Sequence, residues 1–324
     1  MRSIRYRLGA VLAAVFALAA TVTACGGGQA SAPGTLRLGW VVDPCWSQVP
    51  VARDLGLFDK AGVRVEILPF PTGAAALEAL AGGAVDIANG GDVPTAAAAI
   101  KNPALRVVAD GARWDGGRFV ARRSAGIDEI ADLAGRRIAV PLGSSAHFFA
   151  TRFLAEAGIT AELVQTGPAE IVAAVSTGSV DAVAVFQPAL AKVVAALGAD
   201  AVELQGRDKY NQHSLYLATA STVESKSAEI KALLSALRLA DAPLTNREPA
   251  ALAAVAAATG LEQGLIGGVA SEFEFRTELG PELAGDLADR ARWAKSIGRI
   301  PVDATIPDYG ALVAPGPLNG AANG

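Results

Sequence analysis

The stretch LEALAGGAVDIANGGDVP (Leu77–Pro94) and the related stretch VAAVSTGSVDAVAVFQP (Val172–Pro188) decide the expected fold. In each, a helical segment leads through a Gly-x-Val-Asp turn into a short apolar strand. A polar residue then stands near the Pro that opens the next helix. The matched positions are Gly83 and Gly178, Val85 and Val180, Asp86 and Asp181, and Asp92 and Gln187. The repetition is short, and it fits two lobes of similar topology that face each other across a cleft.

Short apolar segments alternate with helical segments on both sides of this repeat. Strands are expected over 36–42, 63–68, 85–88, 105–109, 119–121, 137–141, 162–165, 180–186 and 214–219. Helices are expected over 49–58, 72–81, 94–100, 127–133, 145–157, 168–176, 188–197, 228–240, 249–258, 261–271 and 281–297, with a capping box at Ser221–Glu224. This order predicts an α/β fold of two Rossmann-like lobes, whose parallel-rich sheets carry helices on both faces. Residues 314–324 are expected to form a disordered tail.

Composition excludes several classes of protein. Of the 324 residues, 52% are apolar and 19% charged, so a large core is possible and global disorder is excluded. The formal charge of −4 argues against a nucleic-acid-binding protein, which usually carries a basic patch. Two Cys and two His leave little room for a zinc site, which usually needs three or four such ligands clustered together. We therefore expect no metal and no cofactor.

The N-terminus has the pattern of a secretory signal. Arg2, Arg5 and Arg7 precede an apolar run over 8–20, which is too short for a membrane span. The run ends in VTAC, which is similar to a lipobox and predicts that Cys25 is lipidated after removal of residues 1–24. Residues 25–34 would form a flexible tether. We therefore expect an extracytoplasmic protein, lipid-anchored to the outer face of the cytoplasmic membrane, in which Cys45 has no internal disulfide partner.

Candidate ligand-binding residues follow the strands, because ligands bind beyond the carboxyl ends of the strands in open parallel sheets. They are Asp43, Trp46, Ser47, Gln48, Gly91, Asp92, Trp114, Ser144, Ser145, His147, Phe186 and Gln187. Ser144, Ser145 and Ser47 stand at expected helix starts, where free N–H groups favour an oxyanion, although each also suits a simple N-cap.

Asp92 and the tryptophans have two interpretations each. Asp92 would cap a helix or hold an ammonium group of a ligand. Trp46 and Trp114 would pack in the core or contact that ammonium through cation–π interactions. Catalysis is not favoured: Ser145 and His147, two residues apart on a helix, do not face each other, and the chain has no Gly-x-Ser-x-Gly elbow.

Several segments resemble one family of transport proteins. They are Ala52–Phe58 followed by Gly62-Val63 and Val65-Glu66, then Gly82–Ala88, Ile130–Val140, Gly143–His147 and Trp293–Ile300. Together they are similar to the solute-binding proteins of ABC importers for aliphatic sulfonates, taurine and nitrate, a family that includes binders of thiamine-precursor pyrimidines. Their order and spacing run through nearly the whole mature chain.

The resemblance implies a periplasmic-binding-protein type II fold with two crossing strands. Lobe one would comprise 35–117 and 217–313, and lobe two would comprise 118–216. Ligand contacts are implied at Ser47, Asp92, Ser144, Ser145, His147 and Gln187. Many sulfonate and taurine binders have an acid where this chain has Gln187, between Phe186 and Pro188. This departure weakens the case for an amine-bearing ligand at that position.

We interpret the chain as a substrate-binding lipoprotein that closes two lobes on a small organic anion and delivers it to an ABC permease. A monomer is expected, and no reaction is expected. One alternative is the same fold with a pyrimidine or other heteroaromatic ligand, stacked on Trp46, Trp114 and Phe186. Another is an enzyme on this fold that uses Cys45 or His147.

Overall fold

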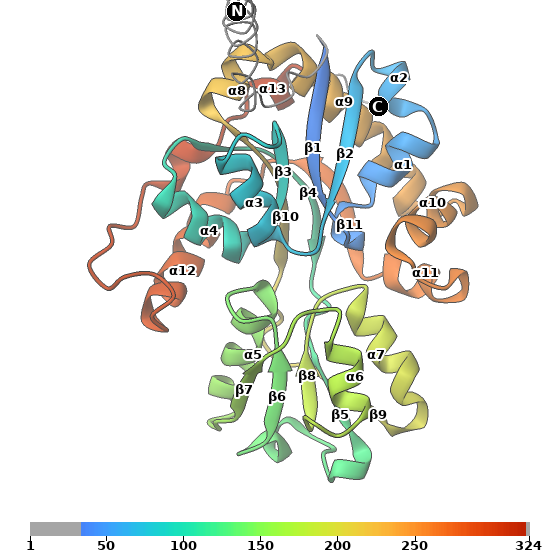
Figure 1. Cartoon of the computed structure of the whole chain (residues 1–324), viewed down its shortest axis with the longest axis vertical. Coiled ribbons are helices and arrows are strands. Elements are labelled where there is room, and N and C mark those ends of the chain that lie inside the picture. The colour runs from blue at the N-terminus through green and yellow to red at the C-terminus, as the bar shows by residue number, and fades with distance from the viewer. Residues whose placement is uncertain (1–33, 322–324) are drawn as a thin grey trace, which may run out of the picture. The chain divides into compact units, whose positions relative to one another are not determined.

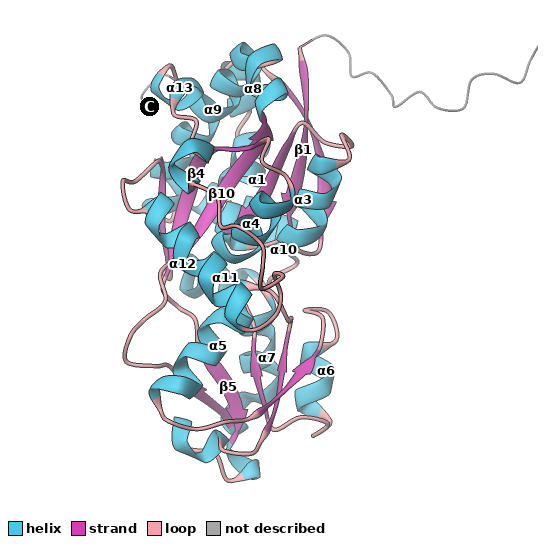
Figure 2. Ribbon diagram, turned by 90° about the vertical axis from the view of Figure 1, so that its left-hand side faces the viewer, coloured by secondary structure: helices cyan, strands magenta, loops and turns pink. Residues whose placement is uncertain are grey.

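The computed structural model describes residues 34–321. The predicted signal segment, Cys25 and nearly all of the predicted tether lie outside the described residues. The described chain forms two sheets flanked by helices (Figures 1 and 2). The six-stranded sheet has the order β11 (Phe273–Glu278), β4 (Leu105–Trp114), β10 (Gln212–Thr219), β3 (Ile87–Gly91), β1 (Thr35–Val41), β2 (Arg64–Phe70). The five-stranded sheet has the order β7 (Glu162–Gln165), β6 (Arg137–Val140), β8 (Ala182–Ala184), β5 (Phe119–Arg122), β9 (Ala201–Leu204).

The helices follow the expected alternation with the strands. They are α1 (Gln48–Asp54), α2 (Leu57–Lys60), α3 (Gly73–Ala81), α4 (Asp92–Lys101), α5 (Ser145–Glu156), α6 (Ile171–Ser176), α7 (Ala189–Leu197), α8 (Ala220–Ser225), α9 (Ser227–Thr245), α10 (Pro249–Thr259), α11 (Gln263–Ala270), α12 (Leu283–Ser296) and α13 (Gly316–Asn319). Short 3-10 turns occur at Pro44–Trp46, Arg123–Ala125, Ile130–Leu133, Gly198–Asp200 and Tyr309–Leu312.

The Asp of each Gly-x-Val-Asp turn makes the same hydrogen bonds to the neighbouring strand in both sheets. The Asp86 carboxylate accepts a hydrogen bond from the Arg37 N–H at 2.8 Å, and the Asp86 N–H donates to the Arg37 carbonyl at 2.8 Å. The Asp181 carboxylate accepts from the Arg137 N–H at 3.0 Å, and its own N–H donates to the Arg137 carbonyl at 2.8 Å. These bonds fix the parallel registers of β1 with β3 and of β6 with β8.

Three strands, β5, β10 and β11, pair antiparallel with their neighbours within the predicted parallel-rich sheets. β10 runs antiparallel between β3 and β4, and β5 runs antiparallel between β8 and β9. The chain passes from the first sheet to the second over 115–118 and returns over 205–211. β10 therefore begins at Gln212, ahead of the expected lobe boundary at 217. The strands β9 and β11 were not predicted from the sequence.

Several local predictions were wrong. The helix expected over 49–58 is divided into α1 and α2, because Gly56 adopts a left-handed φ of 64° between them. Thr219, and not Ser221, caps α8 by accepting from the Thr222 N–H. The tail is not wholly disordered: α13 forms within it, and Leu318 is buried. Residues 322–324 lie outside the described residues.

No single helix within residues 34–321 is long and apolar enough to cross a membrane. Only α10 and α11 taken together reach the required length and apolarity, and they are bent by 107° at their junction.

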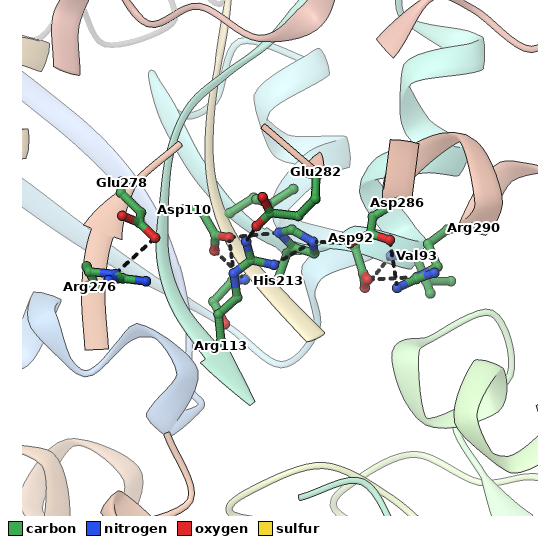
Figure 3. Close-up of polar contacts among 12 residues, drawn as sticks. Asp92, Val93, Asp110, Arg113, His213, Arg276, Glu278, Glu282, Asp286 and Arg290 are labelled. Atoms are coloured by element: carbon green, nitrogen blue, oxygen red, sulfur yellow. Dashed lines mark hydrogen bonds and ion pairs between the residues drawn. The ribbon is translucent and has the colours of Figure 1, made fainter. Parts of the chain in front are cut away.

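A buried charge cluster joins β4, β10 and α12 (Figure 3). His213 Nδ1 lies 2.8 Å from the Asp110 carboxylate, and Nε2 lies 2.9 Å from the Asp286 carboxylate. Burial lowers the pKa of His213, but the hydrogen bonds to the two carboxylates outweigh it and raise the pKa to about 9. Arg113 Nη1 also lies 2.6 Å from Nε2 and favours the neutral ring, since arginine can only donate. The paired carboxylates dominate, so the ring is charged at neutral pH.

We predict that this cluster makes the stability of the fold fall in alkaline solution. A raised histidine pKa contributes stability below the unfolded pKa of 6.5, and that stability is lost as the pH rises through about 9. The loss is at most about 3 kcal/mol, from 1.36 kcal/mol per pKa unit. Denaturant unfolding at pH 6, 8 and 10 measures it. His213→Gln should remove most of the decline, and an undiminished decline in that variant would contradict the assignment to His213.

Candidate binding cleft

The carboxyl ends of both sheets open into one cleft of about 180 Å³. Its wall comes from the ends of β1, β2, β3, β6, β7 and β8, together with β10. The lining residues are Val41, Asp43, Trp46, Thr72, Gly73, Ala74, Gly91, Pro94, Pro141, Leu142, Gly143, Ser144, Ser145, Gln165, Gly167, Pro168, Phe186 and Gln212. Among these residues there is no Lys, Arg or His. At about 30 Å³ per water molecule, the volume suits a ligand of a few heavy atoms.

Helices α3 and α5 both begin on the wall of this cleft. Thr72 caps α3 and accepts from the Ala75 N–H, so the N–H groups of Gly73 and Ala74 have no acceptor within the helix. At the start of α5, Ser144 accepts from the N–H groups of Ala146 and His147, and the Ser145 N–H is likewise without an intrahelical acceptor. Free N–H groups and two helix dipoles therefore favour negative charge here without any basic side chain.

Elements of the two sheets lie in close contact beside the start of α5. A Cβ placed on Gly91 would lie 2.9 Å from the Ser145 Oγ, which is closer than real side chains allow. Gly91 precedes α4 of the first sheet and Ser145 opens α5 of the second. The absence of a side chain at Gly91 lets the two elements meet at the cleft.

Asp43 places a carboxyl group on the same wall. It caps the turn Pro44–Trp46, and its Oδ1 accepts from the Cys45 N–H at 2.8 Å. Burial raises the pKa of Asp43 to about 7, although the hydrogen bonds from the Cys45 N–H and thiol act in the opposite direction. The carboxyl therefore changes charge near neutral pH.

Six of the twelve candidate residues line the cleft. They are Asp43, Trp46, Gly91, Ser144, Ser145 and Phe186. The Ser144 hydroxyl is occupied within its own helix start, where it also donates to the Pro141 carbonyl at 2.6 Å.

The other six candidates do not line the cleft. Ser47 and Gln48 are buried beside it: the Ser47 hydroxyl donates to the Pro44 carbonyl, and Gln48 Nε2 donates to Asp241 at 3.1 Å. The Trp114 Nε1 donates to Glu272 at 2.9 Å, and its ring stacks on Phe273.

Gln187 and His147 are likewise held by neighbouring residues. Gln187 accepts from the Ala191 N–H and donates to Glu272. His147 accepts the Gly143 N–H at 3.1 Å and meets Trp293 edge-on. Burial, and then the positive charge of Arg299, lower the pKa of His147 to about 4. The neutral ring brings no positive charge to the cleft.

Asp92 already has a cationic partner inside the protein. Arg290 Nε lies 3.0 Å from its Oδ2, and the Tyr210 hydroxyl donates to its Oδ1. The Arg290 guanidinium in turn lies over the rings of Phe148 and Tyr210. An ammonium group of a ligand would have to displace Arg290, so the expected ammonium role of Asp92 has no room here.

Sequence reasoning missed several lining residues. Thr72, Gly73 and Ala74 follow the second strand, and Gln165 ends the strand that pairs with β6. All four follow or end a strand, so the preference of ligands for strand ends in open parallel sheets predicts them as well. Gln212 lies at the start of β10 and completes the wall.

We predict that Asp43→Asn stabilises the unliganded protein at alkaline pH. Because the pKa of the Asp43 carboxyl is raised from 3.8 to about 7 by folding, the folded protein loses stability as the pH rises between those two values. Asn keeps the acceptor for the Cys45 N–H and cannot ionise. The gain at pH 8 is at most about 4 kcal/mol, and it should vanish at pH 4. Chemical denaturation at both pH values measures it, and equal stability of the two proteins at pH 8 would contradict the buried, unpaired carboxyl.

The fold and the sequence have known relatives. The chain is 27% identical over 274 residues to the taurine-binding periplasmic protein of Escherichia coli (strain K12), covering 78% of this chain and 83% of that protein. The periplasmic aliphatic sulphonate binding protein SsuA from Escherichia coli superimposes with a TM-score of 0.75 at 24% identity, covering 87% of this chain and 92% of that one. The alkanesulfonate-binding protein SsuA from Xanthomonas axonopodis pv. citri, bound to MOPS, gives 0.75 at 22% identity, covering 88% and 100%. These structures share the fold.

A family model matches more than half of the chain, and this match assigns the family. Residues 45–247 match the family described as NMT1/THI5 like, which is more than half of the 324 residues. The chain belongs to the NMT1/THI5-like family.

Proposed function

We propose that the protein is the extracytoplasmic substrate-binding component of an ABC importer, and that it captures a small organic anion of the sulfonate, taurine or nitrate kind. The observation that carries this proposal is the pair of helix starts, α3 and α5, that present free N–H groups to one small cleft. Because the two helices belong to different sheets, an anion bound to both would hold the two sheets together. The sulfonate- and taurine-binding relatives support the same ligand class.

Binding without a covalent step is the chemistry that the cleft supports. Cys45, the free thiol of the described chain, is buried, and burial together with the Asp43 charge raises its pKa well above the ordinary value. A nucleophilic cysteine needs the thiolate at neutral pH. The Cys45 Sγ instead accepts from Gln212 Nε2 at 3.2 Å. We therefore propose that the protein is not an enzyme.

A heteroaromatic ligand finds less support than a small anion. Trp46 and Phe186 line the cleft, but Trp114 does not, because it packs against Phe273 and Phe149. The three-ring stacking platform expected for a pyrimidine is therefore not assembled.

We predict that Ser145→Ala weakens anion binding and that Ser144→Ala chiefly weakens the fold. Ser145 lines the cleft, and a hydrogen bond from its hydroxyl to a charged ligand group would be worth about 1.5–3 kcal/mol. Affinity should therefore fall by roughly tenfold or more. Loss of the Ser144 cap should lower the free energy of unfolding by about 1 kcal/mol, with a smaller effect on affinity than Ser145→Ala.

A thermal-shift screen of the full chain in detergent against sulfonates, carboxylates, nitrate, bicarbonate and pyrimidines identifies the ligand class, because binding raises the apparent stability. Calorimetric titration of both serine variants with the tightest anion then follows. A shift with pyrimidines alone would refute the anion proposal, and wild-type affinity in Ser145→Ala would refute the role of the Ser145 hydroxyl.

We further propose that Cys25 is lipidated and anchors the protein outside the cytoplasmic membrane. The support is the basic and apolar N-terminal pattern that ends in VTAC. We predict that Cys25→Ala abolishes incorporation of a labelled fatty acid and moves the protein out of the membrane fraction. Cys45→Ala is the matched control and should remain labelled and membrane-bound. Fatty-acid label in the Cys25→Ala protein would contradict the anchor.

A further inference from the structure

We propose that Asp43 determines the specificity of the cleft by selecting ligands that carry an ammonium group beside their anionic group. This inference rests on the proposed capture of a small anion and narrows the ligand class to zwitterions. Asp43 is the one ionisable residue among the described residues that line the cleft.

The other buried aspartates of the described chain each have a cationic partner, which Asp43 lacks. Four aspartates between residues 34 and 321 are buried: Asp43, Asp86, Asp92 and Asp110. Asp86 pairs with Arg37 at 3.1 Å and with Lys226 at 2.9 Å. Asp92 pairs with Arg290 at 3.0 Å, and Asp110 pairs with Arg113 at 2.9 Å and with His213 at 2.8 Å. Asp43 has hydrogen bonds from Cys45 and no cation.

A buried carboxylate without a counter-charge is costly, which is why such groups are usually paired. In this protein the three paired aspartates lie away from the cleft wall, and the unpaired one lies on it. A ligand ammonium would supply the missing cation. Charge-assisted hydrogen bonds from that ammonium would reach a carboxylate that is buried and held by its cap on the turn Pro44–Trp46.

The rest of the wall supplies the opposite pole. The free N–H groups at the starts of α3 and α5 favour the anionic end of a ligand, and they follow β2 and β6. Asp43 follows β1. One small cleft therefore offers a positive pole made of backbone and a negative pole made of one side chain. A purely anionic ligand would satisfy the first pole and leave the Asp43 carboxylate unpaired beside it.

The test uses matched pairs of anions that differ by one amino group. Ethanesulfonate is compared with 2-aminoethanesulfonate, and propionate with 3-aminopropionate, by calorimetric titration of the full chain in detergent at pH 8. We expect the amino member of at least one pair to bind about tenfold tighter or better. In Asp43→Asn that preference should disappear, while the affinity for the member without the amino group stays the same or rises. Asp59→Asn, an exposed change of the same charge on α2, should keep the preference.

Asp43→Ser provides a second variant, since serine is also a good cap and cannot ionise. Thermal melts confirm that both variants are folded. Equal affinity for both members of each pair in the wild type would overturn the role of Asp43 and leave anion capture standing. An equal loss of affinity for both members of a pair in the variants would overturn it as well. Tighter binding of ethanesulfonate at pH 5 that is lost in Asp43→Asn would also overturn it, because Asp43 would then act as a protonated hydrogen-bond donor. If no anion of the wider screen binds, the proposed function itself fails, and this inference fails with it.

Discussion

The carboxylates of Asp86 and Asp181 hold two pairs of parallel strands in register, and the cleft depends on that register. Each carboxylate binds the N–H of an arginine on the neighbouring strand, Arg37 in β1 and Arg137 in β6. A slip of one residue would turn every side chain of a strand to the opposite face. With the register fixed, the ends of β1 and β3 deliver Asp43 and Gly91 to the same place.

The cleft attracts an anion with backbone groups and not with basic side chains. Anion binding by backbone groups requires rigid helix starts, because the N–H groups must be held in position to meet the ligand. Ser144 closes the first turn of α5, and His147 accepts the Gly143 N–H just before it. Their contribution to the cleft is therefore to fix the backbone that a ligand would meet, and a neutral His147 suits that task because its Nδ1 must accept.

The sequence predicts the parts of the fold that have a local signal. The strand Glu162–Gln165 and the Thr72 cap are found where the pattern placed them, and the repeat identified the two anchoring aspartates. The strands β9 and β11 escaped prediction because charged residues interrupt their short apolar content, Glu203 in β9 and Glu274 and Arg276 in β11. Strand ends likewise placed six candidates on the cleft wall. The pairing of Asp92 could not be predicted, because its partner Arg290 lies 198 residues further along the chain, where no local pattern reveals it.

The same long-range pairing explains why one aspartate remains for a ligand. Helix α12 brings Asp286 and Arg290 to β10 and to the start of α4, where they complete the pairs of His213 and Asp92 (Figure 3). Those charges are thereby neutralised within the protein before any ligand arrives. Asp43 lies at the end of β1, where the structure brings no such helix to it, and its carboxyl lowers the stability of the unliganded protein wherever it is ionised. A residue that is unfavourable for folding and lies on the wall of a cleft is what a stability–function trade-off predicts for a binding residue. If a cationic ligand group pairs with Asp43, the free energy lost in the unliganded state is recovered on binding, so the same carboxyl both destabilises the free protein and favours its ligand-bound form.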